Sequence, residues 1–257
     1  MRLDSYLYEK GLCKSRTMAK DNILNNLVKV NDVIVNKASL DISDSDVVTL
    51  INNVHDFASR GGLKLLEALK NFSVDVNDNI CLDLGASTGG FCDVLLINGA
   101  SKVFALDVGT NQLAHHLLND ERIVNLQKTD VRDLPLLNFN DHIDFISIDM
   151  SFISIIYAFK AIKESFNYPI RIIGLIKPQF EVGNKHINKH GVVKNDKIVV
   201  DKLQEFFYYF VNNNYSIENI SKCHTLGKKG NQEYLVYLQS KSNNTMSIEE
   251  FLRRITC

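Results

Sequence analysis

The sequence predicts an α/β protein with a mostly parallel, seven-stranded sheet and a small N-terminal α+β domain. From residue 59 onward, short apolar runs alternate with amphipathic segments at the rhythm of βαβ units. The last two apolar runs, 217–223 and 233–239, have no helix-length segment between them. A parallel pair needs a crossover, so these two strands are expected to pair antiparallel at one edge of the sheet.

Residues 1–58 are predicted to form the separate small domain. Leu3 and Leu7 mark one face of a first helix, and Ser15 is the expected N-cap of a second helix that ends near residue 26. Residues 28–35 alternate around Asn31-Asp32, which is typical of a β-hairpin. A third strand is expected at 47–51, and residues 52–58 are expected to be a linker.

Residues 59–241 are predicted to form the large domain. After a helix that begins near Gly61-Gly62, strands are expected at 80–84, 102–107, 122–127, 145–148, 171–176, 217–223 and 233–239. Helices are expected at 89–98, 111–118, 153–166 and 194–212, and residues 242–257 are expected to be a charged tail with helical periodicity from Ser247. A mostly parallel sheet with an antiparallel edge is the architecture of Rossmann-like methyltransferases that use S-adenosylmethionine.

Charge is distributed unevenly along the chain. The net charge of −1 gives no global nucleic-acid signature. Residues 1–20 nevertheless carry five Lys/Arg against two acids, whereas residues 61–173 carry nine bases and fourteen acids. Residues 174–241 carry ten bases and six acids. An acidic middle between two basic flanks suits a polyanion held at both ends beside a cofactor domain, and ordinary scatter of surface charge is the alternative.

Five cysteines with irregular spacing and no C-x-x-C pair argue against a disulfide scaffold and against a zinc site, so no metal is expected. No signal-peptide core follows Met1, and no apolar run approaches the ~18 residues of a membrane-spanning helix. We therefore expect a cytoplasmic protein with no membrane partner.

The segment Asp83-Leu-Gly-Ala-Ser-Thr-Gly-Gly-Phe91 is the most informative motif, because it predicts a buried strand, a glycine turn and a helix start. Its glycines are expected to bring bare backbone near a ligand at the helix N-terminus. Ala86 and Ser87 stand where a dinucleotide fingerprint requires its second glycine, and no P-loop lysine follows. Asp83 favours a ligand with a positive group, such as S-adenosylmethionine. A glycine turn needed only for packing is the alternative.

Two further acids follow predicted strands. Asp107 ends the second strand, where a carboxylate can accept hydrogen bonds from the ribose hydroxyls of NAD or S-adenosylmethionine alike. Asp130 follows the third strand and can accept the exocyclic amine of an adenine, with a helix N-cap as the alternative. Together these acids would line the carboxyl edge of the sheet.

Four charged residues stand at element edges, where packing does not require them. They are Lys64, Asp149, Lys177 and Glu233. Pro178 blocks continuation of the strand and leaves Lys177 at the mouth of the sheet, beside Asp149 on the neighbouring strand. Methyl transfer to a sugar hydroxyl requires that the hydroxyl be oriented and its proton removed. A partly desolvated lysine near a second cation can supply a neutral amine as base, whereas surface ion pairs are the alternative for each residue alone.

The order of these four residues resembles the K-D-K-E tetrad of 2′-O-ribose methyltransferases of the FtsJ type. The words Ser59-Arg-Gly-Gly-Leu-Lys64, Asp149-Met-Ser-Phe-Ile-Ser154, Leu175-Ile-Lys-Pro-Gln-Phe-Glu181 and Lys189-His-Gly-Val-Val193 are similar to the TlyA family. Its members act as ribosomal RNA 2′-O-methyltransferases and are called hemolysins in older naming. The N-terminal Arg2-Leu3-Asp4 and Lys14-Ser15-Arg16 resemble the RNA-binding domain first described in ribosomal protein S-four.

The resemblance implies roles for particular residues. The four charged residues take the tetrad roles, with Lys177 as the central lysine beside the target hydroxyl. S-adenosylmethionine would be bound by Asp83, Gly85, Ala86, Ser87, Thr88, Gly89, Gly90, Phe91, Asp107, Val108, Asp130 and Val131. RNA would be bound by Arg2, Lys14, Arg16, Lys20, Arg60, Lys185 and Lys189. The implied substrate is cytidine in ribosomal RNA of the small subunit, the large subunit or both, so ribosomal subunits are the expected partners.

Other classes of function remain as alternatives. A membrane-acting hemolysin has no support from a spanning segment or a strongly basic amphipathic helix. An NAD-dependent oxidoreductase would require a glycine at Ala86 or Ser87. A non-catalytic RNA-binding or ribosome-assembly protein that keeps the fold is the main alternative, and the intact glycine loop and tetrad favour the enzyme.

Overall fold

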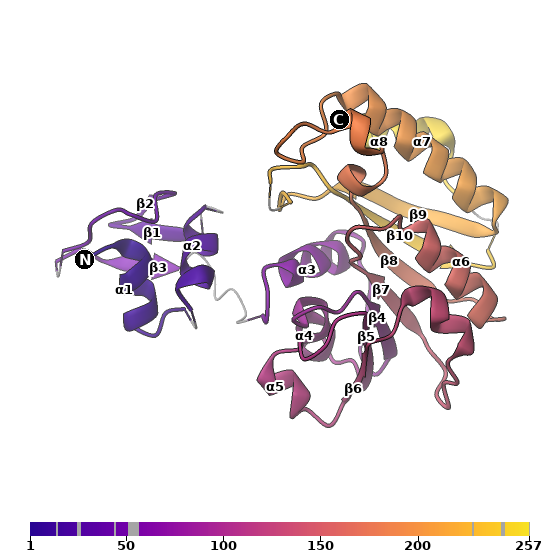
Figure 1. Cartoon of the computed structure of the whole chain (residues 1–257), viewed down its shortest axis with the longest axis horizontal. Helices are drawn as coiled ribbons and strands as arrows, with labels where there is room; N and C mark the ends of the chain where they lie inside the picture. Colours follow the sequence, from indigo (N-terminus) through magenta and orange to yellow (C-terminus); the bar gives the residue numbers. More distant parts are fainter. Residues whose placement is uncertain are drawn as a thin grey trace. The chain divides into compact units, whose positions relative to one another are not determined.

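A seven-stranded sheet lies at the centre of the larger of two compact units, Gly61–Cys257, in the order β6-β5-β4-β7-β8-β10-β9 (Figure 1). The computed structural model describes residues 1–13, 15–24, 27–43, 45–50, 57–227, 229–242 and 245–256. The strands are β4 Ile80–Leu84, β5 Lys102–Asp107, β6 Ile123–Gln127, β7 Phe145–Ile148, β8 Arg171–Ile176, β9 Tyr215–Lys222 and β10 Tyr234–Ser240. β10 pairs antiparallel with both β8 and β9, and the other pairings are parallel. The predicted fold class is confirmed.

Helices cover both faces of this sheet. They are α3 Gly61–Asn71, α4 Gly90–Ile97, α5 His115–Leu118, α6 Ile156–Ser165, α7 Asp196–Asn212 and α8 Ile248–Thr256, with the 3-10 helices η1 Val131–Leu136, η2 Pro178–Phe180 and η3 Asn184–His186. Figure 1 shows α3 and α4 on one face of the sheet and α6, α7 and α8 on the other. The central strands are therefore covered on both sides. Leu82, Ile146 and Ile172 have no exposed surface, as a continuous apolar run in a parallel strand predicts.

Two predicted helices begin later than expected, and backbone conformation explains both. The helix expected at 111–118 forms only at His115–Leu118, because Asn111 adopts a φ of 53° and Ala114 is extended with ψ 145°. The helix expected at 153–166 begins at Ile156, after Phe152 with a φ of 72°. Neither conformation belongs to a right-handed helix.

The C-terminal segment that we expected to be a tail packs as part of the larger unit. Its α8 buries Phe251 and Ile255 completely or nearly so, at 0% and 1% exposure. The ring of Phe251 meets that of Phe207 on α7 edge to face, with centroids 5.2 Å apart. Apolar burial therefore makes this helix a part of the core.

The smaller unit, Met1–Arg60, contains α1 Leu3–Glu9, α2 Arg16–Leu24, β1 Val28–Val30, β2 Val33–Ile34 and β3 Val48–Leu50, with sheet order β2-β1-β3. The expected cap is present, because the N–H of Met18 donates to Ser15 Oγ over 3.1 Å. Asn31 and Asp32 have φ values of 50° and 62°, as the two positions of a type I′ hairpin turn require. Residues 52–56 of the expected linker lie outside the described residues, as does Ile51 at the end of the third expected strand. No helix among the described residues is long and apolar enough to cross a membrane.

Candidate active site

The carboxyl ends of β7 and β8 bring Asp149 and Lys177 together. These strands are parallel neighbours, so residues that follow them emerge at the same edge of the sheet. Lys177 Nζ lies 2.6 Å from Asp149 Oδ1, in an ion pair that lacks the angles of a hydrogen bond. The same ammonium donates to Ser151 Oγ over 2.9 Å. The pair is largely buried, with side-chain exposures of 10% for Lys177 and 21% for Asp149.

Lys64 and Glu233 form a second, more deeply buried pair. Lys64 comes from the first turn of α3, and Glu233 immediately precedes β10. Lys64 Nζ donates to Glu233 Oε2 over 2.5 Å, and the two side chains are 8% and 3% exposed. A buried ion pair is a weak source of net stability, because both charges lose their hydration. Stability therefore explains this pair less well than a role in the chemistry or the geometry of the site.

Gln179 links the Glu233 pair to the turn that carries Lys177. Its Nε2 donates to Glu233 Oε1 over 3.0 Å. Because a carboxylate only accepts, this bond fixes which end of the amide faces Glu233. The other end, Gln179 Oε1, is buried with no hydrogen-bond partner among the described residues. A buried acceptor without a partner is rare in folded proteins and calls for an explanation.

The glycine loop after β4 packs against the end of β7. Gly85 has a φ of 87°, and a Cβ there would lie 2.8 Å from the carbonyl oxygen of Asp149. Gly89 has a φ of 95°, and its Cβ would meet Leu117 Cδ1 at 2.1 Å. Packing against a neighbouring backbone therefore requires glycine at Gly85, as the packing alternative predicts, whereas the left-handed conformation favours glycine at Gly89. The packing also holds the loop directly beside the Asp149 backbone.

Asp107 orders the same loop. Its carboxylate accepts the N–H of Ser87 over 2.8 Å and that of Gly109 over 2.7 Å. A carboxylate offers about four acceptor positions, so two remain for ribose hydroxyls. Ser87 and Thr88 are exposed, and the neighbouring Val108 is 70% exposed, which is unusual for an apolar side chain. This part of the loop is open to a ligand.

Asp83, which was expected to contact the ligand, is buried in β4 beneath the loop. It has no exposed surface, and its carboxylate accepts hydrogen bonds from Ser147 Oγ over 2.7 Å and Cys92 Sγ over 3.2 Å. Burial raises the pKa of Asp83 to about 7, against the opposing effect of these two bonds. Any influence on a bound cation is electrostatic. Several other predicted loop residues are likewise buried, namely Ala86, Gly90, Phe91 and Val131.

Asp130 is the N-cap of η1. Its carboxylate accepts the N–H of Arg132 over 2.9 Å and the same residue's Nε and Nη2 over 2.8 and 2.6 Å. The Arg132 guanidinium lowers the pKa of Asp130 to about 2. In this structure Asp130 therefore acts as a helix N-cap, which was the alternative role given above. A contact of Asp130 with adenine remains a proposal.

The residues expected to bind RNA lie in both units. In the smaller unit, Arg2, Arg16 and Lys20 all contact the carboxylate of Asp4, and Lys14 lies outside the described residues. In the larger unit, Lys185 and Lys189 are exposed on and after η3. Arg60 is partly buried at the end of the smaller unit.

Sequence reasoning missed three residues on the segments that follow β7 and β8. Ser151 accepts from the ammonium of Lys177, and Gln179 joins the turn of Lys177 to Glu233. Phe152 is 86% exposed at a φ of 72°, with its ring 5.2 Å from that of Phe180. All three stand within two or three residues of Asp149 or Lys177, and that proximity is the signal available in the sequence.

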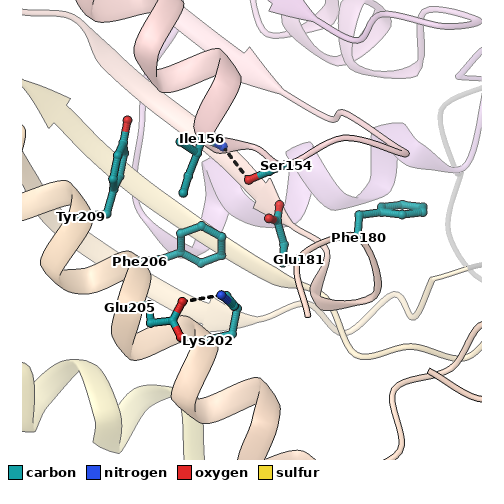
Figure 2. A pocket seen from close by; sticks show the side chains of 8 residues that line it. All are labelled: Ser154, Ile156, Phe180, Glu181, Lys202, Glu205, Phe206 and Tyr209. Atoms are coloured by element: carbon teal, nitrogen blue, oxygen red, sulfur yellow. Dashed lines mark hydrogen bonds and ion pairs between the residues drawn. The ribbon is translucent and has the colours of Figure 1, made fainter. Parts of the chain in front are cut away.

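A cavity of ≈ 340 Å³ lies among the α6 start, the segment after β8 and α7. Figure 2 shows its eight lining side chains, from Ser154, Ile156, Phe180, Glu181, Lys202, Glu205, Phe206 and Tyr209. Glu181 accepts the N–H of Ile155 over 2.8 Å, and burial raises the pKa of this carboxyl group. Lys202 pairs with Glu205. No tetrad residue lines this cavity, and Glu181 there secures the start of α6.

A mostly parallel seven-stranded sheet with an antiparallel β10, and a glycine loop beside a lysine–carboxylate cluster at its carboxyl edge, define a Rossmann-like methyltransferase. The FtsJ-like methyltransferase model matches residues 57–240, and the S4 domain model matches residues 1–48. The chain therefore belongs to the FtsJ-like methyltransferase family, within the TlyA group that carries an S4 domain.

Relatives match over nearly the full length. The chain is 39% identical over 238 residues to Hemolysin A of Brachyspira hyodysenteriae, covering 92% of this chain and 99% of that protein. It is 34% identical over 254 residues to the 16S/23S rRNA (cytidine-2′-O)-methyltransferase TlyA of Mycobacterium tuberculosis, covering 96% and 92%. A solved structure described as a hemolysin from Streptococcus thermophilus superposes with a TM-score of 0.75 at 33% identity, covering 99% and 94%.

Proposed function

We propose that this protein transfers a methyl group from S-adenosylmethionine to the 2′-hydroxyl of a cytidine in ribosomal RNA. The observation that carries the proposal is the pair of lysine–carboxylate contacts at one sheet edge, linked through Gln179 and adjoining the glycine loop. The relative named as a 16S/23S rRNA cytidine-2′-O-methyltransferase supports the choice of substrate.

The residues around the loop fit S-adenosylmethionine. Asp107 retains acceptor positions for ribose hydroxyls, and Val108 offers an exposed apolar surface to an adenine ring. Asp130 adds a carboxylate for the adenine amine, and the Asp83 carboxylate beneath the loop favours the positive methionine end when it is ionised. When bound, the cofactor supplies the methyl group on a sulfonium that is already reactive.

The tetrad supplies orientation and proton transfer. Lys177 Nζ, held by Asp149 and Ser151, takes the proton of the target 2′-hydroxyl in the fraction of molecules where its amine is neutral. Lys64 adds a second buried cation, which is paired with Glu233. Glu233 holds Lys64 in place and balances its charge. Alignment of hydroxyl and methyl group then contributes the remaining acceleration.

RNA contacts come from both units. The smaller unit supplies Arg2, Arg16, Lys20 and Arg60, together with Lys14 from the sequence pattern, and the larger unit supplies Lys185 and Lys189. Contacts of this kind bind phosphates, so affinity falls steeply with salt. Phe152, three residues after Asp149, carries an exposed ring that is suited to stacking on an unstacked base.

The test is methylation of purified small and large ribosomal subunits that lack the modification, with methyl-labelled S-adenosylmethionine and mapping of the labelled ribose. Lys177→Ala is the inactive variant, and Lys163→Ala removes an exposed lysine of α6 as the matched control. Label on a cytidine 2′-oxygen that persists with Lys163→Ala and disappears with Lys177→Ala supports the proposal and identifies the subunit. Absence of label on both subunits, with measurable cofactor binding, overturns it and leaves a non-catalytic RNA-binding protein or another RNA substrate.

A further inference from the structure

Three basic side chains of the smaller unit converge on one buried carboxylate. Arg2 Nε lies 3.0 Å from Asp4 Oδ1, Arg16 Nη2 lies 3.2 Å from Oδ2, and Lys20 Nζ lies 3.9 Å from Oδ2. The Asp4 side chain is 0% exposed, whereas the three cations are 49%, 52% and 50% exposed. We refer to these four residues as the Asp4 cluster.

Helices α1 and α2 carry the four residues of the Asp4 cluster. Arg2 is the N-cap residue of α1 and Asp4 lies in its first turn. Arg16 and Lys20 are four residues apart on α2, so they share a helix face. The backbone of Asp4 is anchored, because its N–H donates to the carbonyl of Ala38 over 3.1 Å. The carboxylate is thus a fixed point between two helices.

The net charge of the cluster does not explain the presence of Asp4. The cluster combines one carboxylate with three cations, which leaves two surplus positive charges at the surface. The Arg2 guanidinium, and then that of Arg16, lowers the pKa of Asp4 to about 2, so the carboxylate stays ionised at neutral pH. A permanent negative charge opposes phosphate binding by simple electrostatics. Any benefit of this carboxylate to RNA binding must therefore be geometric.

We propose that Asp4 is a positioning residue, which holds Arg2, Arg16 and Lys20 as one preformed surface for the phosphates of RNA. The inference rests on the proposed function, because RNA is the ligand of this surface. Long basic side chains lose rotamer freedom when they bind, and a carboxylate that orders them beforehand removes part of that cost. A guanidinium has five N–H donors, so bonds to Asp4 leave others free for phosphate.

The direction in which Asp4→Asn changes RNA affinity distinguishes a positioning role from a purely electrostatic one. Asp4→Asn keeps the size of the side chain and removes its charge. If charge alone matters, RNA affinity rises and its salt dependence steepens. If Asp4 positions the cations, affinity falls by about tenfold, the loss expected for one hydrogen bond to a charged group, and the salt dependence becomes shallower. The measurement is titration of the full chain with a fluorescein-labelled RNA hairpin at several salt concentrations.

Asp32→Asn is the matched control, because it removes the same charge from the β1–β2 turn, outside the Asp4 cluster. It is expected to leave affinity unchanged or to raise it slightly. Arg16→Ala is then measured in the wild-type and Asp4→Asn backgrounds. Positioning predicts a smaller loss in the Asp4→Asn background, since the arginine is already disordered there, whereas independent roles predict that the two losses add.

Circular dichroism and thermal unfolding will show whether Asp4→Asn unfolds the smaller unit. If it does, Asp4→Glu is measured in its place. It keeps the charge and moves the carboxylate by one methylene, so positioning predicts weaker RNA binding by a folded protein. Folded variants that bind as tightly as the wild type, or more tightly, overturn the inference. Failure of the proposed RNA function looks different, because then Arg16→Ala also has no effect.

Discussion

Gln179 donates a hydrogen bond from Nε2 to Oε1 of Glu233 over 3.0 Å, and so joins the turn after β8 to the residue that pairs with Lys64. The two lysine–carboxylate pairs are therefore not independent. A shift of the Lys177 turn would move Gln179 and alter the surroundings of Glu233. The Oε1 of Gln179 is buried and has no hydrogen-bond partner among the described residues.

Gln179→Met should lower the kcat of RNA methylation by about tenfold to a hundredfold, the scale on which small displacements of catalytic groups act. The side chain keeps its length but loses both the bond to Glu233 and the free acceptor. The dissociation constant of S-adenosylmethionine should not change. Gln239→Met, at the far end of β10, is the control. A kcat within twofold of the wild type would show that the link has no role in catalysis.

Lys64→Met should lower the free energy of unfolding by about 3–5 kcal/mol, because it leaves the Glu233 carboxylate buried without its cation. The double variant Lys64→Met/Glu233→Leu replaces both charges by apolar groups and should regain most of that loss. It should nevertheless remain inactive. Urea denaturation and a methylation assay on the same samples check both statements. If Lys64→Met alone is as stable as the wild type, Lys64 and Glu233 do not form a buried ion pair.

Gly85→Ala should destabilise the larger unit by more than Gly230→Ala does. Both glycines have a φ near +87°, at 87° and 86°, so both alanines carry the left-handed penalty of about 1–2 kcal/mol. Only at Gly85 does the new Cβ also meet a backbone oxygen, that of Asp149, at 2.8 Å, whereas Gly230 has open space. Thermal unfolding compares the two. Gly85→Ala should also weaken cofactor binding, and equal losses of stability would rule out the packing explanation.

Asp83 should make the cofactor-free protein less stable as the pH rises from about 4 to 7. Its folded-state pKa of about 7 lies above the ordinary value of 3.8, so in this window the folded state binds more protons than the unfolded state. Each unit of that difference corresponds to about 1.4 kcal/mol. Asp83→Asn should therefore gain stability relative to the wild type at pH 8 and lose this advantage at pH 4. A pH-independent difference between the two proteins would refute the raised pKa.

Phe152→Ala should leave stability within about 0.5 kcal/mol of the wild type, because the side chain is exposed. Its kcat/KM for RNA should fall about 5- to 100-fold, the cost of removing one base–aromatic stack. Phe152→Tyr should restore most of the activity. Tyr208→Ala, which removes an exposed ring from α7, is the control and should have no effect. Equal activity of both alanine variants would exclude stacking at this position.

Much of the fold could be predicted because its signals are local. Four strands, at 80–84, 102–107, 145–148 and 171–176, have the bounds expected from the sequence, since each is a short apolar run covered on both faces. The cap at Ser15 and the turn at Asn31-Asp32 are set by side-chain and backbone preferences within a few residues. The pattern of acids and lysines at strand ends likewise indicated the edge of the sheet at which the site lies.

The tertiary structure alone decided which of those residues meet and what each glycine is for. Lys64 and Glu233 are 169 positions apart, and only the packing of α3 beside β10 brings them together. The contact of Gly85 with the Asp149 backbone depends on the approach of two strands, which no local preference encodes. The sequence by itself determined the elements and the residue types at their ends, because these follow from propensity and periodicity. The contacts arise from packing between distant segments, which is a property of the folded chain.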